Sequence, residues 1–121
     1  MNINGIDLNF DFTSPTDMMR YRTAATRLAK RAAEIPDLPT STDDPQYMEK
    51  YIDMLNGTLK VYGDFVDEIF GDGTANKLMG DNPSMAKVLE IRAAIDEALE
   101  QEGRKLGAQM AKYIPNRAEK E

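Results

Sequence analysis

The sequence predicts a mainly α (α+β) domain, in which an N-terminal β-hairpin precedes a three-helix antiparallel bundle with a long C-terminal helix. Over residues 1–12, apolar and polar side chains alternate, which is the period of a half-buried strand. Farther along, apolar residues recur every three or four positions in three long stretches, each preceded by a helix-start pair that ends in proline. The 121 residues suit one domain, expected over residues 1–115 and followed by a flexible polar tail at 116–121.

The hairpin is expected over residues 1–12, with residues 1–3 as its first strand. Asn4-Gly5 is the commonest two-residue hairpin turn, because both positions tolerate a positive φ. A two-stranded hairpin is only marginally stable in water, so helices or another sheet edge must cover its apolar face. We therefore predict that this edge also offers contacts to a partner through its apolar residues, Ile3, Ile6, Leu8, Phe10 and Phe12.

The first helix is expected over residues 15–35. Ser14 has the residue type of an N-cap, Pro15 suits the first helical position, and Pro36 ends the pattern. This helix carries five basic side chains, which either hold an acidic partner or pair with the acidic second helix, within the fold or between subunits. Three of them share approximately one face and are predicted partner contacts: Arg20, Arg27 and Arg31.

The second helix is expected from Pro45 to about Phe70, with Asp44 as its cap and Gly71 at its end. Four acidic residues near its C-terminal end share one face, namely Asp64, Asp67, Glu68 and Asp72. Such a face offers the oxygen ligands that divalent cations prefer, but the alternating acids and closing Glu of a calcium loop are absent. A solvated acidic face is therefore favoured over a metal site.

Residues 71–82 are expected to form a turn with one short helical segment capped by Thr74. Asn82-Pro83 then starts a last helix that reaches about Ile114, a length of roughly 45 Å, which exceeds what a compact domain of this size requires. Part of this helix is expected to pack outside the chain or to break near Gly103. Its predicted partner contacts are Leu99, Leu106 and Met110.

The composition excludes several kinds of catalysis. Without Cys or His, the chain has no disulfide, thiol nucleophile, imidazole base or ordinary zinc or haem site. A net charge of −6 argues against non-specific binding to nucleic acid, which needs clustered basic residues. We expect no enzyme activity, cofactor, catalytic residue or metal ligand, and no nucleic-acid or membrane partner. No signal peptide or membrane span is recognisable, so a cytoplasmic location in a bacterial host cell is expected.

Two segments carry a resemblance to a known group of proteins. They are INGIDLNFDF at residues 3–12 and YGDFVDEIFGDGTANKLMG at residues 62–80. Together they resemble small proteins encoded among the tail genes of phages and prophages of Gram-positive bacteria, in which an acidic-aromatic helix runs into an FGxGTAxKLxG-like turn before a long C-terminal helix. The resemblance implies a non-enzymatic tail assembly chaperone that holds the tape-measure protein, or another tail protein, during tail morphogenesis. It implies no catalytic residues.

Other roles stay open beside this one. The chain is also compatible with a structural tail component, or with a small acidic inhibitor of a host defence protein that uses the face around Asp64 and Asp67. The basic first helix argues against a DNA mimic, which exposes a continuous negative strip. Gly103-xxx-Gly107 marks either a packing notch or a contact between copies in a homo-oligomer. A carboxylate-based metal-dependent hydrolase has the least support, for want of a convincing ligand set.

Overall fold

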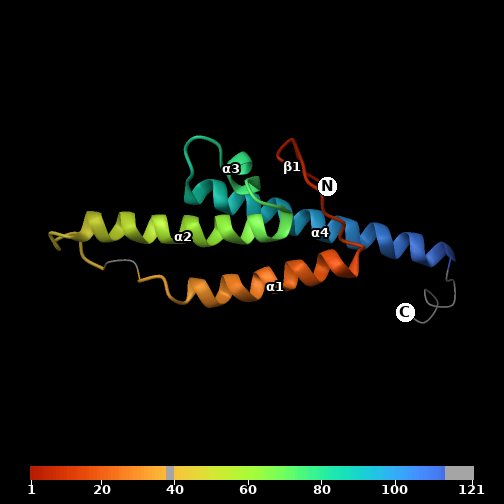
Figure 1. Ribbon diagram of the computed structural model, residues 1–121, viewed down its shortest axis with the longest axis horizontal. Helices are drawn as coiled ribbons and strands as arrows, with labels where there is room; N and C mark the ends of the chain where they lie inside the picture. Colours follow the sequence, from red (N-terminus) through yellow and green to blue (C-terminus); the bar gives the residue numbers. More distant parts are fainter. Residues whose placement is uncertain (38–39, 114–121) are drawn as a thin grey trace.

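The computed structural model describes residues 1–37 and 40–113, and it confirms the mainly helical class with an N-terminal hairpin and a long C-terminal helix. Figure 1 shows α1 and α2 side by side in opposite directions, while α4 starts alongside the middle of α2 and runs on past its end. The elements in chain order are β1 (Asn2–Ile3), β2 (Ile6–Asp7), α1 (Pro15–Ala32), α2 (Tyr47–Phe70), α3 (Thr74–Met79) and α4 (Met85–Tyr113). The polar tail at 116–121 and residue 114 lie outside the described residues.

The hairpin forms at the predicted turn. β1 and β2 pair antiparallel, with Ile3 opposite Ile6. Asn4 and Gly5 connect them with φ angles of 51° and 82°, so both turn residues adopt the positive φ that a tight hairpin turn of this kind requires. Each strand contributes two residues to the ladder.

The segment after β2 keeps the predicted alternation without being a strand. Leu8 and Phe10 are buried, whereas Asn9 between them is exposed. The backbone N–H of Leu8 still donates to the Met1 carbonyl at 2.6 Å, beyond the last residues of the two strands. The period-2 pattern thus reports an extended segment with one covered face, which the helices rather than a longer sheet bury.

The N-cap residue was predicted correctly for α1 and wrongly for α2. Ser14 caps α1 as predicted, since its Oγ accepts a hydrogen bond from the Asp17 N–H at 3.3 Å. The start of α2 was predicted wrongly: Gln46 is the N-cap and Tyr47 the first helical residue. Asp44 instead accepts from the Gln46 N–H at 2.8 Å, which closes a local turn and delays entry into the helix by two residues.

The other two helix starts also differ from the prediction. Thr74 is the first residue of α3 and is buried, while Gly73, with φ of 87°, is the N-cap. Ser84 rather than Asn82 prepares α4, because its Oγ accepts from the Lys87 N–H at 3.3 Å. α3 therefore begins one residue earlier than predicted, with the Asp67 carboxylate accepting from the Ala75 N–H, and α4 begins two residues later than predicted, where the Ser84 hydroxyl is the acceptor. α4 is continuous through Gly103, and α1 ends at Ala32, before the predicted residue 35.

The hydrophobic core lies where α2, α3 and α4 meet the N-terminal segment. α1 contributes one residue to the fully buried set, Ala24, and otherwise packs on the flank of α2 through half-buried side chains. The core consists of Ile3, Leu8, Phe10, Ala24, Phe65, Val66, Ile69, Ala75, Met79, Val88, Ile91 and Ile95. Because α1 and α4 pack on different sides of α2, the surface of α2 between them is only partly covered.

Candidate functional site

An open groove with a volume of about 260 Å³ lies between α1 and α4, on α2. Three of the five residues that α1 contributes are alanines, so α1 leaves space that larger side chains would fill. Phe65 and Ile95 add apolar surface from α2 and α4. The complete lining is Tyr21, Ala25, Leu28, Ala29, Ala32, Tyr62, Phe65, Arg92, Ile95 and Asp96.

Polar groups lie along the α4 side of this groove. Arg92 donates from Nη1 to the Tyr62 hydroxyl at 2.5 Å, and its guanidinium lies 5.9 Å from the centre of that ring. This hydrogen bond raises the pKa of Arg92, whose guanidinium is charged at any ordinary pH. Burial raises the pKa of Tyr21, and the charge of Asp96 raises it further while Arg92 lowers it. The groove thus combines apolar walls with a cation and a carboxylate one helical turn apart.

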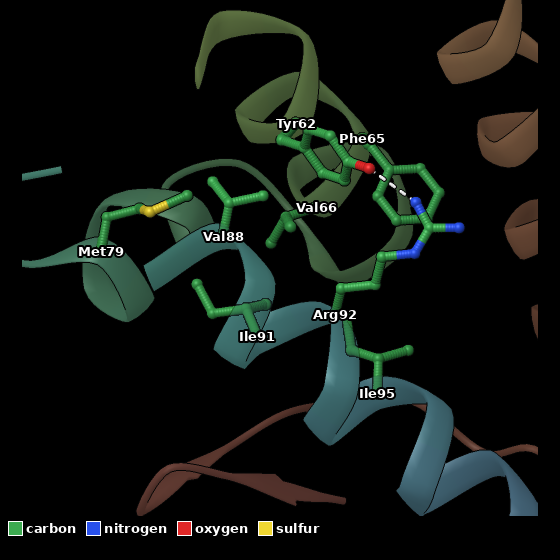
Figure 2. A pocket seen from close by; sticks show the side chains of 8 residues that line it. All are labelled: Tyr62, Phe65, Val66, Met79, Val88, Ile91, Arg92 and Ile95. Carbon is green, nitrogen blue, oxygen red and sulfur yellow. Dashed lines mark hydrogen bonds between the residues drawn. The ribbon is translucent and has the colours of Figure 1, made fainter. Parts of the chain in front are cut away.

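A second space, beneath Arg92, is too small to hold a ligand. Figure 2 shows the side chains of α2, α3 and α4 that enclose it, with Arg92 at one edge beside Tyr62. Its volume is about 10 Å³. A buried water needs at least about 10–15 Å³ and two or more polar partners, and these walls are almost wholly apolar. This space is therefore a gap in the packing, and the open groove is the stronger candidate.

The predicted contact residues of the N-terminal segment belong to the core. Ile3 is 1% exposed, and Leu8 and Phe10 are also buried. Ile6 and Phe12 are half-buried and pack against this core, where the Phe12 ring meets the Phe10 ring edge-on at 4.8 Å. The fold of the same chain buries Ile3, Leu8 and Phe10, whereas Ile6 and Phe12 keep part of their surface exposed, so a partner contact at this segment stays a prediction.

The predicted basic face pairs within the chain, which is the internal alternative that the charge pattern left open. Arg31 donates to Oε1 of Glu68 at 2.9 Å, and Arg27 lies 3.8 Å from the same oxygen. α1 is thereby held to α2 by ion pairs between the basic and the acidic helix. Arg20 also turns inward, toward the C-terminal end of α2.

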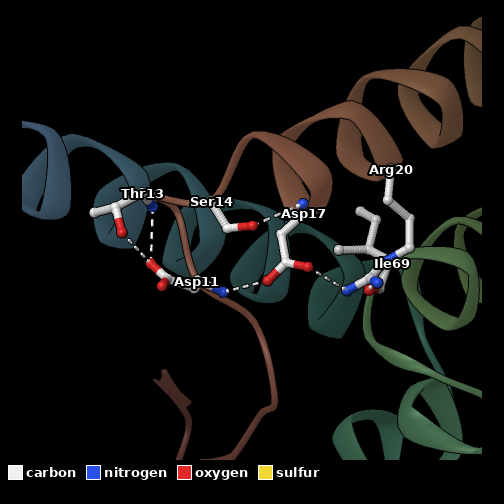
Figure 3. Close-up of polar contacts among 6 residues, drawn as sticks. All are labelled: Asp11, Thr13, Ser14, Asp17, Arg20 and Ile69. Carbon is white, nitrogen blue, oxygen red and sulfur yellow. Dashed lines mark hydrogen bonds and ion pairs between the residues drawn. The ribbon is translucent and has the colours of Figure 1, made fainter.

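Figure 3 shows how Arg20 joins three segments. Its Nε donates to the Ile69 carbonyl at 2.9 Å, and its Nη2 lies 3.4 Å from Asp17. Asp17 in turn accepts from the backbone N–H of Asp11 at 2.9 Å, in the segment that leads into α1. The last carbonyls of a helix have no partner within it, so Arg20 satisfies one of those of α2. This residue therefore has a structural role in the fold.

The acidic face of α2 is also engaged within the chain. Asp67 accepts from the Ala75 N–H at 2.8 Å and so fixes the start of α3, while Asp64 pairs with Lys60 at 3.2 Å. Glu68 pairs with α1, as described above. Within residues 1–37 and 40–113, no group of three or more metal-ligating side chains gathers in a way that would hold an ion.

The third predicted surface lies on α4 and is partly covered. Leu99, Leu106 and Met110 are half-buried. None of these three side chains packs against the core of the described residues. Figure 1 shows that the last turns of α4 extend beyond α1 and the hairpin. The apolar side of this end of the helix therefore lies apart from the core, with part of its surface exposed.

The groove was not singled out from the sequence. Its one sequence signal is the run of alanines on α1, including Ala25, Ala29 and Ala32, because small residues on an apolar stripe leave room for a neighbour. Arg92 and Asp96 look like ordinary surface charges on α4. Only the placement of α4 beside Tyr62 makes them part of a groove.

These features define a small, mainly helical domain with a closed core and an open apolar groove on one side. The chain belongs to a family of unknown function, DUF6673, whose model matches residues 4–121. No curated protein and no solved structure matches it. None of the helices in the described parts of the chain has the length and apolarity needed to cross a membrane.

Proposed function

We propose that this protein is a non-enzymatic tail assembly chaperone of a phage or prophage, and that it holds an amphipathic helix of the tape-measure protein in the groove between α1 and α4. The open, apolar groove is the observation that carries this proposal. The resemblance of residues 3–12 and 62–80 to small tail-gene proteins supports the choice of partner. The second of these segments includes Tyr62 and Phe65, which line the groove.

The size and shape of the groove favour a helix over a small molecule. Small-molecule sites typically have volumes of roughly 300–1,000 Å³ and enclose most of their ligand, whereas this groove is smaller and partly open. An amphipathic helix binds such a groove by inserting apolar side chains spaced three or four residues apart. Arg92 and Asp96 at the side of the groove then select a helix with an acidic and a basic residue flanking those anchors.

Binding through this groove alone is expected to be reversible. Each large apolar side chain that it buries contributes roughly 1.5–3 kcal/mol. The loss of translational and rotational freedom opposes association by an estimated 4–15 kcal/mol. Two or three anchors therefore give a weak complex, which suits a chaperone that must release its client when the tail tube assembles.

Co-purification with a phage tape-measure protein tests this function. The wild-type chain should be recovered with it, whereas Ala29→Arg should reduce recovery at least about tenfold, because the new side chain fills the groove with a charge. Ala33→Arg is the matched control, since Ala33 is exposed at the end of the same helix and does not line the groove. Failure of the wild type to co-purify would refute the choice of client.

Equal recovery of the Ala29 and Ala33 variants would instead show that the client binds elsewhere on the chain. The acidic-inhibitor alternative has less support, because Asp64 and Glu68 are already paired with Lys60 and Arg31. A role as a structural tail component predicts that the protein remains in purified virions, which mass spectrometry of the particles can test.

A further inference from the structure

The apolar stripe of α4 continues beyond the domain that buries its first half. Val88 and Ile95 lie in the core, and Leu99, Leu106 and Met110 follow on the same side of the helix at intervals of four, seven and four residues. Alternating intervals of this kind are the spacing of a helix that packs lengthwise on another helix. The continuation reaches the turns of α4 that extend past α1 and the hairpin in Figure 1.

Two glycines on this part of α4 have no packing role inside the described chain. A Cβ atom at Gly103 or Gly107 would meet no atom of the described residues within 4 Å. Each glycine destabilises an exposed helix by roughly 1 kcal/mol relative to alanine. Gly103 lies between Leu99 and Leu106 on the apolar stripe, where a missing side chain lets a second helix approach closely.

The charges on either side of Gly103 indicate what this second helix is. Residues 96–102 contain four acidic side chains and no basic one, whereas residues 104–112 contain three basic side chains and no acidic one. Two copies of this segment in antiparallel orientation place each acidic block beside the basic block of the other copy. A parallel pair would place like charges side by side, which is destabilising. The segment is therefore complementary to itself in one orientation.

We propose that residues 96–113 of two copies pair in antiparallel orientation and form a two-fold symmetric homodimer. Such an interface is isologous, because each contact occurs twice. The 18 residues span about 27 Å, or two and a half heptads, so the dimer is expected to form in a concentration-dependent way. This proposal stands apart from the proposed client, because it depends on α4 beyond the core and is tested with the purified protein alone.

Sedimentation equilibrium over a range of concentrations tests the dimer. The wild-type mass should rise from 13.6 kDa toward twice that value. Leu106→Lys should raise the dissociation constant at least about tenfold, because it buries a charge in place of an apolar side chain. Leu89→Lys is the matched control: Leu89 is 63% exposed on the first half of α4, so its variant should dimerise like the wild type. A wild type that stays monomeric at about 1 mM, or equal constants for both variants, would overturn the proposal.

Charge reversal tests the orientation. Glu100→Lys with Glu102→Lys leaves the acidic block with two acidic and two basic side chains and no net charge, and Lys105→Glu with Lys112→Glu leaves the basic block with two acidic side chains and one basic one. Each double variant alone should dimerise at least about tenfold more weakly than the wild type, and an equimolar mixture should recover the dimer. Higher salt should shrink these differences, since the charges are at the surface.

A parallel pair predicts a different result, because neither double variant would then be weaker than the wild type. Circular dichroism of each double variant should show the helicity of the wild type, so that a loss of dimer is not a loss of fold. Two helical variants that fail to recover the dimer when mixed would refute the self-complementary pairing.

Discussion

Arg20→Met is expected to lower the free energy of unfolding by about 2 kcal/mol. The Nε of Arg20 donates to the Ile69 carbonyl, and a hydrogen bond from a charged group contributes roughly 1.5–3 kcal/mol. Its guanidinium also lies 5.8 Å from the Phe10 ring, which adds about 0.5–1 kcal/mol at an exposed site. Because the Arg20 side chain is 44% exposed, water compensates for part of the lost hydrogen bond and part of the lost contact with the Phe10 ring. The ion pair with Asp17 adds little for the same reason. Methionine keeps most of the apolar stem.

Urea denaturation followed by circular dichroism measures this change. With a slope of about 2 kcal/mol per molar urea, the midpoint should fall by about 1 M. Arg22→Met is the matched control, because Arg22 lies on the same helix and is exposed, and its variant should stay within about 0.5 kcal/mol of the wild type. Equal midpoints for the two variants would refute the structural role of Arg20. A loss of client binding at unchanged stability would instead support the partner contact that the sequence predicts.

Two further substitutions test the core and the groove. Ile69→Ala should lower the free energy of unfolding by about 2–5 kcal/mol, because Ile69 is 1% exposed. Ile52→Ala is the control and should change the free energy of unfolding far less, because Ile52 is 48% exposed. Calorimetry measures both, and similar melting temperatures of the two variants would contradict the described core. Burial raises the pKa of Tyr21 above its usual value of 10.0. The protonated phenol therefore contributes to the free energy of unfolding below that pH, and this contribution is lost as the pH rises through the folded-state pKa. The stability of the wild type relative to Tyr21→Phe should therefore fall as the pH rises above about 9, and a constant difference would show that the phenol is not perturbed.

Short sequence patterns predicted the turns and helices better than they predicted which surfaces those elements expose. The Asn4-Gly5 turn and the Ser14 cap are confirmed, because each depends on residues only a few positions apart. The start of α2 was predicted two residues early, since the Asp44 side chain can bond either to a helix or to the turn before it. The bonds compete within one turn of chain, so residue type alone does not decide between them.

The surfaces were harder to predict, for a physical reason. An apolar stripe shows that one side of an element is covered, but not by what. The stripe at residues 8–12 packs into the core with helices of the same chain, whereas Leu106 and Met110 are half-buried and do not pack against that core. Arg20 and Arg31 share a basic helix, and only the position of α2 shows that both turn toward it.

The sequence by itself determined the class of fold, the order of hairpin and helices, the opposite charges of the first two long helices, and the lack of Cys and His chemistry. These properties depend on composition and on neighbours within a few residues. The tertiary structure alone decided that α1 and α4 flank α2 with a groove between them, and that the Ile69 carbonyl takes its hydrogen bond from Arg20. Such features depend on how helices far apart in the chain settle against one another, because burial and ion pairing are set by the placement of whole elements.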